Sequence, residues 1–421
     1  MRKPIKFSTV PPYFYVLIPL FLLLLAGIIW VNYRFVVENP GGNDFLVHWV
    51  GTRSLLIDGI SPYTDAVALR IQTMAYGRPA RSGEHELRVA YPLYSIFIFF
   101  PFALIGDYTI ARTLWMTLLE IALMFLVFLS LRLTNWKPKL WMMLIIFLFS
   151  LLWYHGLRPL INGNAVILVA VFVVASLVAF RDERDELAGI LLALATIKPH
   201  LAILPILFIW FYAISLRRWR VVLWTILGVV LLSLAAMIFL PNWILQNIWE
   251  VLRYPNYNPP VTPGAALSTW LPASGKRLGW ILSGILGVVL LVEWRIARGK
   301  EFRWFVWTTC LTLVISQWIG IPTDPGNFIL IITPLILTFS VWDERWGFKG
   351  RVLICAWLIM LFVGLWFLFL RTVEYEGQPL QSPIMFFPLP AVALIGLYWV
   401  RWWAIRPPRL LVEMLRESQV L

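Results

Sequence analysis

The chain has 421 residues, of which 60% are hydrophobic and only 14% are charged. Because a soluble protein of this length cannot bury so much apolar surface, the composition indicates a polytopic membrane protein and excludes a soluble enzyme. The sequence contains two cysteines, which excludes a disulfide scaffold, and its net charge of +13 fits cationic cytoplasmic loops and membrane lipids better than nucleic acid.

The apolar runs predict an all-α membrane protein with about twelve transmembrane helices, in a single polytopic domain over residues 1–421. The first run, near residues 12–32, follows Arg2, Lys3 and Lys6, so we expect a retained first helix and a cytoplasmic N-terminus. We expect the C-terminus on the same side of a plasma membrane. The other runs lie near residues 108–131, 140–155, 164–180, 187–198, 200–215, 221–240, 277–296, 304–321, 328–342, 352–370 and 384–403.

Two long segments are predicted to lie outside, residues 33–106 and residues 241–275. Within the first, the apolar stretch 91–106 allows two readings, a short span or a helix lying on the membrane surface. If it spans, the cations of residues 132–139 end up outside; if it lies at the outer interface, they are cytoplasmic. The positive-inside rule favours the second reading.

Asp44 begins a helical pattern in the first outer segment. It follows the turn Asn39-Pro40-Gly41-Gly42, and apolar residues then recur at helical spacing as far as Asp58-Gly59. The pattern predicts a juxtamembrane amphipathic helix lying on the membrane. A carboxylate at its start is either an N-cap or a catalytic base held at the lipid–water boundary.

Three other charged residues are predicted at the same outer level. Lys198, in Lys198-Pro199-His200, interrupts an apolar stretch, and it either snorkels to the interface or binds a lipid phosphate. Arg158 is either an interface anchor or a second phosphate-binding cation. Asp324, between two prolines, is either a turn-forming residue or a site carboxylate.

The order of these segments resembles a known family. NDFLVHWVGTRSLLIDGISPYTD follows the first run, YPLYSIFIFFPFALIG and RPLINGNAVILV come next, and AGILLALATIKPHLAILPILFIWFYAISLRRWR ends on a basic cluster. The pattern, over about residues 12–342, resembles the polytopic membrane glycosyltransferases of the GT-C fold. It is most similar to glycosyltransferase family 87, the polyprenyl-phosphomannose-dependent α-mannosyltransferase group.

The resemblance implies transfer of a hexose, with mannose expected, from a polyprenyl-phosphate-sugar donor to a lipid or glycan acceptor at the outer face, with inversion. It implies Asp44 as the general base and Lys198, with Arg158, near the donor phosphate. It offers further residues for substrate binding: His48, Tyr63, Tyr91, Asn164, His200 and Asp324. No zinc-type spacing and no Gly-rich nucleotide loop is visible, so we expect no metal and no cofactor.

The alternative from another class is a lipid or glycan transporter that performs no covalent chemistry. A transporter should carry ionisable residues near the membrane midplane on several helices. Here Glu120 alone is clearly mid-span, and a hydrogen-bonded structural carboxyl is its ordinary reading. The charge distribution therefore favours the enzyme.

Overall fold

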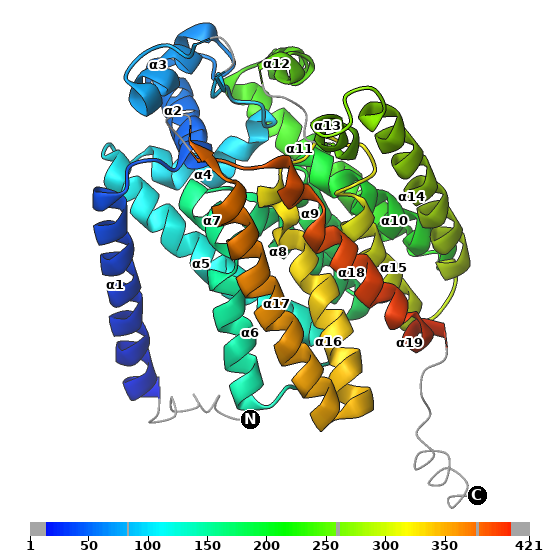
Figure 1. The fold of residues 1–421 in the computed structure, drawn as a ribbon. Helices are drawn as coiled ribbons and strands as arrows, with labels where there is room; N and C mark the ends of the chain where they lie inside the picture. Colours follow the sequence, from blue (N-terminus) through cyan, green and yellow to red (C-terminus); the bar gives the residue numbers. More distant parts are fainter. Residues whose placement is uncertain (1–13, 82–83, 258–261, 376–378, 406–421) are drawn as a thin grey trace, which may run out of the picture.

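The computed structural model describes residues 14–81, 84–257, 262–375 and 379–405, and nearly all of its regular structure is helical (Figure 1). The first half contains α1 (Phe14–Glu38), α2 (Asn43–Asp58), α3 (Asp65–Tyr76), η1 (Leu93–Ser95), α4 (Ile96–Ala103), α5 (Tyr108–Leu133), α6 (Leu140–Leu152), α7 (Tyr154–Asn162), α8 (Val166–Arg181), α9 (Asp185–Ala195) and α10 (Pro199–Ser215).

The second half continues the bundle. Its helices are α11 (Trp219–Phe239), α12 (Trp243–Tyr257), α13 (Pro263–Ser268), α14 (Gly275–Ala297), α15 (Phe302–Ile315), η2 (Pro325–Ile331), α16 (Ile332–Trp346), α17 (Phe348–Thr372), η3 (Pro383–Phe386), α18 (Pro388–Trp399) and α19 (Arg401–Ile405). Two-residue strands, β1 (Glu374–Tyr375) and β2 (Pro379–Leu380), pair antiparallel.

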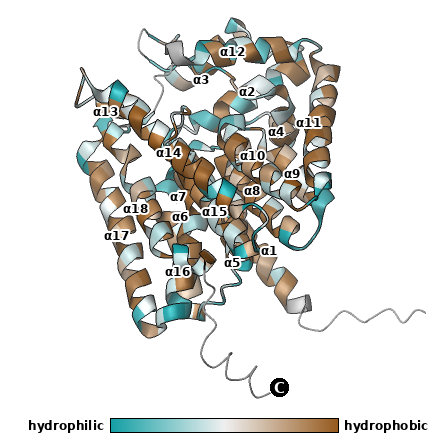
Figure 2. Ribbon diagram, turned by 90° about the vertical axis from the view of Figure 1, so that its right-hand side faces the viewer, coloured by the Kyte–Doolittle hydropathy of each residue, from teal (hydrophilic) through white to brown (hydrophobic). Residues whose placement is uncertain are grey.

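The bundle has a buried centre and an apolar rim. The continuous segment from η2 into α16 is buried from Pro325 to Trp342, and α5 packs on α8 beside it. By contrast, only 11% of the span in α1 is buried, and α11, α14 and α17 are also largely exposed. Because the exposed surfaces of α11 and α17 are mostly hydrophobic (Figure 2), they fit contact with lipid rather than water.

Six helices are long and apolar enough to cross a membrane, and a seventh span results if α6 and α7 are counted as one. A bend of 49° separates α6 from α7, which corrects the continuous run predicted over residues 140–155. Five further apolar helices are shorter, with 10–17 residues. The prediction of about twelve spans therefore depends on whether short helices also cross.

The stretch 91–106 forms η1 and α4, which together cover Leu93–Ala103. At 1.5 Å per residue this helix is about 16 Å long, roughly half of a 30 Å hydrocarbon core. It is thus too short to span by itself, and its position at the interface stays a prediction. Within 241–275, α12 is likewise only 15 residues long.

The helix predicted after Asp44 is present as α2, but it does not lie flat on the membrane with one free face. Nearly every side chain from Phe45 to Leu55 is buried, because α2 packs against α3, α4 and α5. In the first outer segment α3 has the amphipathic pattern instead, with one buried face formed by Val67, Ala68, Ile71 and Gln72. Figure 1 places α2, α3 and α12 together at one end of the bundle.

Candidate active site

Asn164 lies between the two charged residues that the sequence singled out. Its side-chain Nδ2 donates to Oδ2 of Asp44 at 2.9 Å, and its Oδ1 accepts from Nζ of Lys198 at 2.8 Å. The same Oδ1 accepts from the backbone N–H of Val166 at 2.9 Å, where α8 starts. The structure therefore brings Asp44, Asn164 and Lys198 together through one amide group.

Local backbone geometry sets the position of Asn164. Gly163 ends α7 in the left-handed conformation, with φ of 70°, which glycine adopts without strain. The N–H of Asn164 then donates to the carbonyl of Pro159 at 2.8 Å. A Cβ on Gly163 would lie 2.5 Å from Cβ of Phe45, so α2 approaches α7 closely only because this residue is glycine.

The N-cap reading of Asp44 is wrong. The cap residue of α2 is Gly42, in the left-handed conformation and without a side-chain cap bond, and Asp44 lies in the first turn of the helix. Just before α2, Arg112 ties the chain to α7 by donating to the carbonyl of Asn39 at 2.7 Å and to that of Ile161 at 3.1 Å. The Asp44 carboxylate does not cap the helix and accepts from Asn164.

The electrostatic environment of Asp44 suits a base. Burial raises the pKa of the Asp44 carboxyl above its ordinary value of 3.8, and the charge of Lys198 partly opposes that rise. Among the described residues, neither Asp44 nor Lys198 has an ion-pair partner within 4 Å. A neutral amide therefore orients the Asp44 carboxylate, and no salt bridge among the described residues neutralises it.

Lys198 is buried and does not snorkel. Only 5% of it is exposed, and it is the N-cap residue of α10, with Pro199 at the first helical position. Its Nζ donates to Oδ1 of Asn164 and, at 2.7 Å, to Oδ1 of Asn327. The ring of Tyr91 lies 5.6 Å from Nζ, a cation–π distance. Two neutral amide oxygens and a ring thus hold the ammonium while its charge stays unneutralised.

Asn327 is a site residue that the sequence reasoning missed. It lies in η2, and its Nδ2 donates to Oγ1 of Thr323 at 3.1 Å. Asp324 caps η2 by accepting from the N–H of Gly326 at 2.6 Å, so its turn-forming reading is confirmed. The turn had drawn attention to Asp324, but nothing in the sequence indicated that the asparagine three residues later would reach Lys198.

Arg158 lies on α7 near the same turn. A Cβ on Gly326 would be 3.9 Å from its Nε, and that Nε has no hydrogen-bond partner among the described residues. The adjacent His155 is fully buried, and one ring nitrogen contacts the carbonyl of Pro325 at 2.8 Å. Since a carbonyl only accepts, Nδ1 carries the proton. Arg158 thus lies beside η2 with an unpaired donor, although it makes no bond to Asp44 or Lys198.

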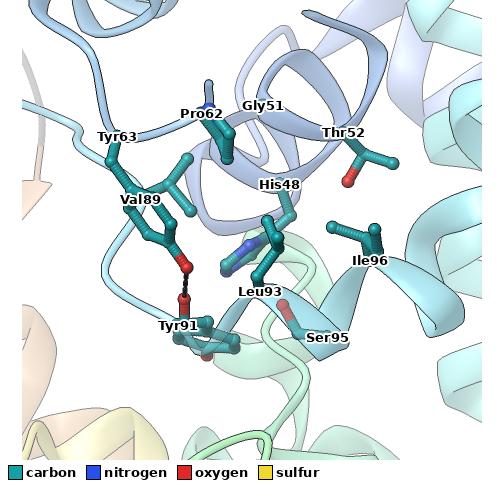
Figure 3. A pocket seen from close by; sticks show the side chains of 10 residues that line it. All are labelled: His48, Gly51, Thr52, Pro62, Tyr63, Val89, Tyr91, Leu93, Ser95 and Ile96. Carbon is teal, nitrogen blue, oxygen red and sulfur yellow. Dashed lines mark hydrogen bonds between the residues drawn. The ribbon is translucent and has the colours of Figure 1, made fainter. Parts of the chain in front are cut away.

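The remaining predicted binding residues occupy different positions. His48 is buried, and its ring lies 4.0 Å from the ring of Tyr91. Burial and the Lys198 charge lower the pKa of His48 to about 3, so it is neutral. Tyr63 donates to the backbone carbonyl of Tyr91 at 2.8 Å, a supporting role (Figure 3). His200 lies in the first turn of α10, partly exposed.

A small pocket adjoins this cluster. Figure 3 shows His48, Tyr63 and Tyr91 around it, with hydroxyl groups from Thr52 and Ser95. Its volume is about 10 Å³, about the space of a single water molecule. A sugar does not fit this pocket, so any substrate must reach Asp44 and Lys198 from elsewhere.

Comparison with known proteins decides the family. Residues 90–316, more than half of the chain, match glycosyltransferase family 87. The chain belongs to glycosyltransferase family 87. No curated protein and no solved structure matches it. The part that matches family 87 contains Tyr91, Arg158, Asn164, Lys198 and His200, whereas Asp44 and Asn327 lie outside it. The chain is thus a multi-pass membrane glycosyltransferase of family 87.

Proposed function

We propose that this family 87 enzyme transfers a hexose, with mannose expected, from a polyprenyl-phosphate-sugar donor to a hydroxyl group of a lipid-linked or glycan acceptor. The observation that carries the proposal is the placement of Asp44 and Lys198 on opposite ends of the Asn164 amide. A carboxylate that accepts a proton and a cation that meets a phosphate are the two groups that this reaction requires.

In the proposed reaction Asp44 is the general base. The acceptor oxygen attacks the anomeric carbon, its proton moves to the Asp44 carboxylate, and the bond from the anomeric carbon to the phosphate oxygen breaks. The phosphate leaves with the bonding electrons, and a single attack from the opposite face inverts the anomeric centre. Asp44 then returns its proton to water.

Lys198 is proposed to stabilise the charge that develops on the departing phosphate. Because its two protein partners are neutral amides, no hydrogen-bonded carboxylate competes with the phosphate for the Lys198 ammonium. Arg158 offers a second, unpaired donor next to η2. We expect no metal and no cofactor in this scheme, and that stays a prediction.

The membrane arrangement is part of the proposal. About twelve spans of a GT-C-like bundle result if α8, α9, α10, α15 and α18 also cross, together with the bent pair α6 and α7. Residues 33–106 and 241–275 then lie outside and both termini lie in the cytoplasm. The transporter alternative rested on mid-span ionisable residues such as Glu120. Glu120 accepts from Nδ2 of Asn32 at 2.9 Å, which fits a structural carboxyl and adds no support to a transporter.

Purified full-length protein tests the proposal directly. It is incubated with isotopically labelled polyprenyl-phosphate hexoses and with membrane lipid extracts as acceptors, and products are identified by mass spectrometry. We expect one labelled glycosylated lipid or glycan, absent with Asp44→Asn. Label transfer from a nucleotide sugar but not from any polyprenyl-phosphate hexose would refute the donor class.

A further inference from the structure

A groove lined by residues of α17 and of the start of α6 lies on this protein. Figure 1 places the N-terminal ends of α6 and α17 at the end of the bundle away from α2, the helix that carries Asp44. The 13 residues of α6 extend about 20 Å from this groove before the chain bends into α7, which carries Arg158. The groove has a volume of about 270 Å³, and its walls are formed by Lys139, Trp141, Phe348, Arg351, Val352 and Cys355. Cationic and apolar side chains therefore share one hollow at the end of the bundle opposite the candidate active site.

The two cations of the groove differ in how far they are paired. The side chain of Lys139 is exposed and makes no hydrogen bond or ion pair among the described residues. Arg351 uses only Nε, which lies 3.5 Å from a carboxylate oxygen of Asp343 and donates to the carbonyl of Gly347 at 3.3 Å. The same carboxylate also accepts from Nε1 of Trp136 at 2.9 Å, so the aspartate is shared. The terminal nitrogens of Arg351 donate no hydrogen bond in the described structure, although the guanidinium is ion-paired with Asp343.

Two helix starts add to this positive field. The N-cap residues of α6 and α17 are Lys139 and Gly347, and neither makes a side-chain cap bond. The unpaired N–H groups in the first turn of a helix carry partial positive charge and favour an anion. Here they reinforce two cationic side chains that line the groove.

The apolar wall identifies the kind of anion. Phe348 is 75% exposed and Trp141 is 45% exposed, and both lie on helices whose outer surfaces are apolar. In a membrane protein such surfaces contact acyl chains, and a soluble phosphate has no apolar part that could contact them. We propose that this groove binds the phosphate group of an acidic phospholipid from the leaflet opposite Asp44, with an acyl chain along α17.

Cys355 supplies a local probe of occupancy. It lines the groove, whereas Cys310 is fully buried, so a small maleimide should alkylate Cys355 alone. Delipidated full-length protein in neutral detergent is titrated with phosphatidylglycerol or with phosphatidylcholine of the same acyl chains, and intact mass follows alkylation. We expect phosphatidylglycerol to slow alkylation and phosphatidylcholine to leave it unchanged.

Matched variants test the role of charge. Lys139→Gln should raise the phosphatidylglycerol concentration for half-protection about fivefold, the effect of one basic residue at an anionic lipid surface. Lys139→Arg should keep the protection. Lys300→Gln serves as the control, since Lys300 is an exposed lysine on another loop, between α14 and α15. Native mass spectrometry gives a second readout, in which wild type should retain one more phosphatidylglycerol than Lys139→Gln.

Several results would overturn the proposal. Equal protection by phosphatidylcholine would make the groove a general acyl-chain surface, and unchanged protection in Lys139→Gln would place the lipid elsewhere. Protection by inorganic phosphate alone would indicate a free-anion site. Stronger protection by polyprenyl phosphate than by phosphatidylglycerol would assign the groove to a prenyl lipid instead. None of these outcomes depends on glycosyl transfer.

Discussion

Replacing Asp44 with asparagine separates catalysis from folding in the proposed active site. Asparagine has the same shape, and its own carbonyl oxygen can still accept from Nδ2 of Asn164 at the present 2.9 Å contact. It cannot take a proton from an acceptor hydroxyl. A positioned general base contributes about 10²–10⁴-fold, so transfer should fall by that factor, or roughly 3–5.5 kcal/mol of barrier.

The Asp44→Asn variant should be as stable as the wild-type protein or more stable, although its transfer activity falls. Burial raises the pKa of Asp44, so the folded protein holds the protonated form more tightly than the unfolded chain does. That contribution is complete below the unfolded pKa, near 3.8, and is lost as pH rises through the folded pKa. Keeping Asp44 ionised above its folded pKa therefore costs stability, and Asp44→Asn should unfold at the same or a higher temperature.

The assay measures initial transfer rates at saturating donor and the unfolding midpoint of the same preparation. Asp107→Asn is the matched control, because Asp107 is an exposed carboxylate that caps α5, an asparagine can keep that cap, and activity should be retained. Wild-type turnover should fall as pH drops through the raised pKa of Asp44, which lies above 3.8. Turnover in Asp44→Asn within about threefold of wild type, at matched folding, would refute the general-base assignment.

Three other perturbations test separate parts of the structure. Lys198→Ala should raise the KM for donor and lower kcat, and Lys198→Arg should keep partial activity; unchanged constants in Lys198→Ala would remove it from the site. Glu250→Gln breaks a buried bidentate pair with Arg88, whose two nitrogens lie 2.8 Å from the carboxylate oxygens, and should lower the free energy of unfolding by about 3 kcal/mol. Arg253 is more exposed, so Arg253→Gln should change the free energy of unfolding little. In a chain without its natural cysteines, Thr73→Cys and Lys137→Cys should label from opposite sides of the membrane, and same-side labelling would contradict the topology.

Much of the local structure could be predicted from the sequence. Apolar length and helical spacing predicted the long helices and the helix after the glycine turn, and the short apolar stretch 91–106 was expected to be a short span or a surface helix. These features depend on neighbours in the chain. The break after α6 was missed because Trp153 and Tyr154 are apolar enough to continue the run, so hydropathy alone shows no end.

The geometry of the site could be predicted only in part. Asp44 and Lys198 stood out as charges beside apolar runs, but contacts over 120 and 129 residues join Asp44 to Asn164 and Lys198 to Asn327. No periodicity predicts such pairings, because the fold as a whole brings α2, α7, α10 and η2 together. The burial of α2 was missed for the same reason: its surroundings come from later helices.

The glycine between α7 and Asn164 has a consequence for recombining this chain with its relatives. Cβ of Phe45 occupies the space that a side chain on Gly163 would need, and Trp115 closes the other side at 3.2 Å. A chimera that joins the first 100 residues of this protein to a relative with any larger residue at the position of Gly163 would push the two segments apart. A crossover between residues 46 and 162 therefore takes Phe45 and residue 163 from different parents, and it is tolerated only if the second parent also has glycine at that position.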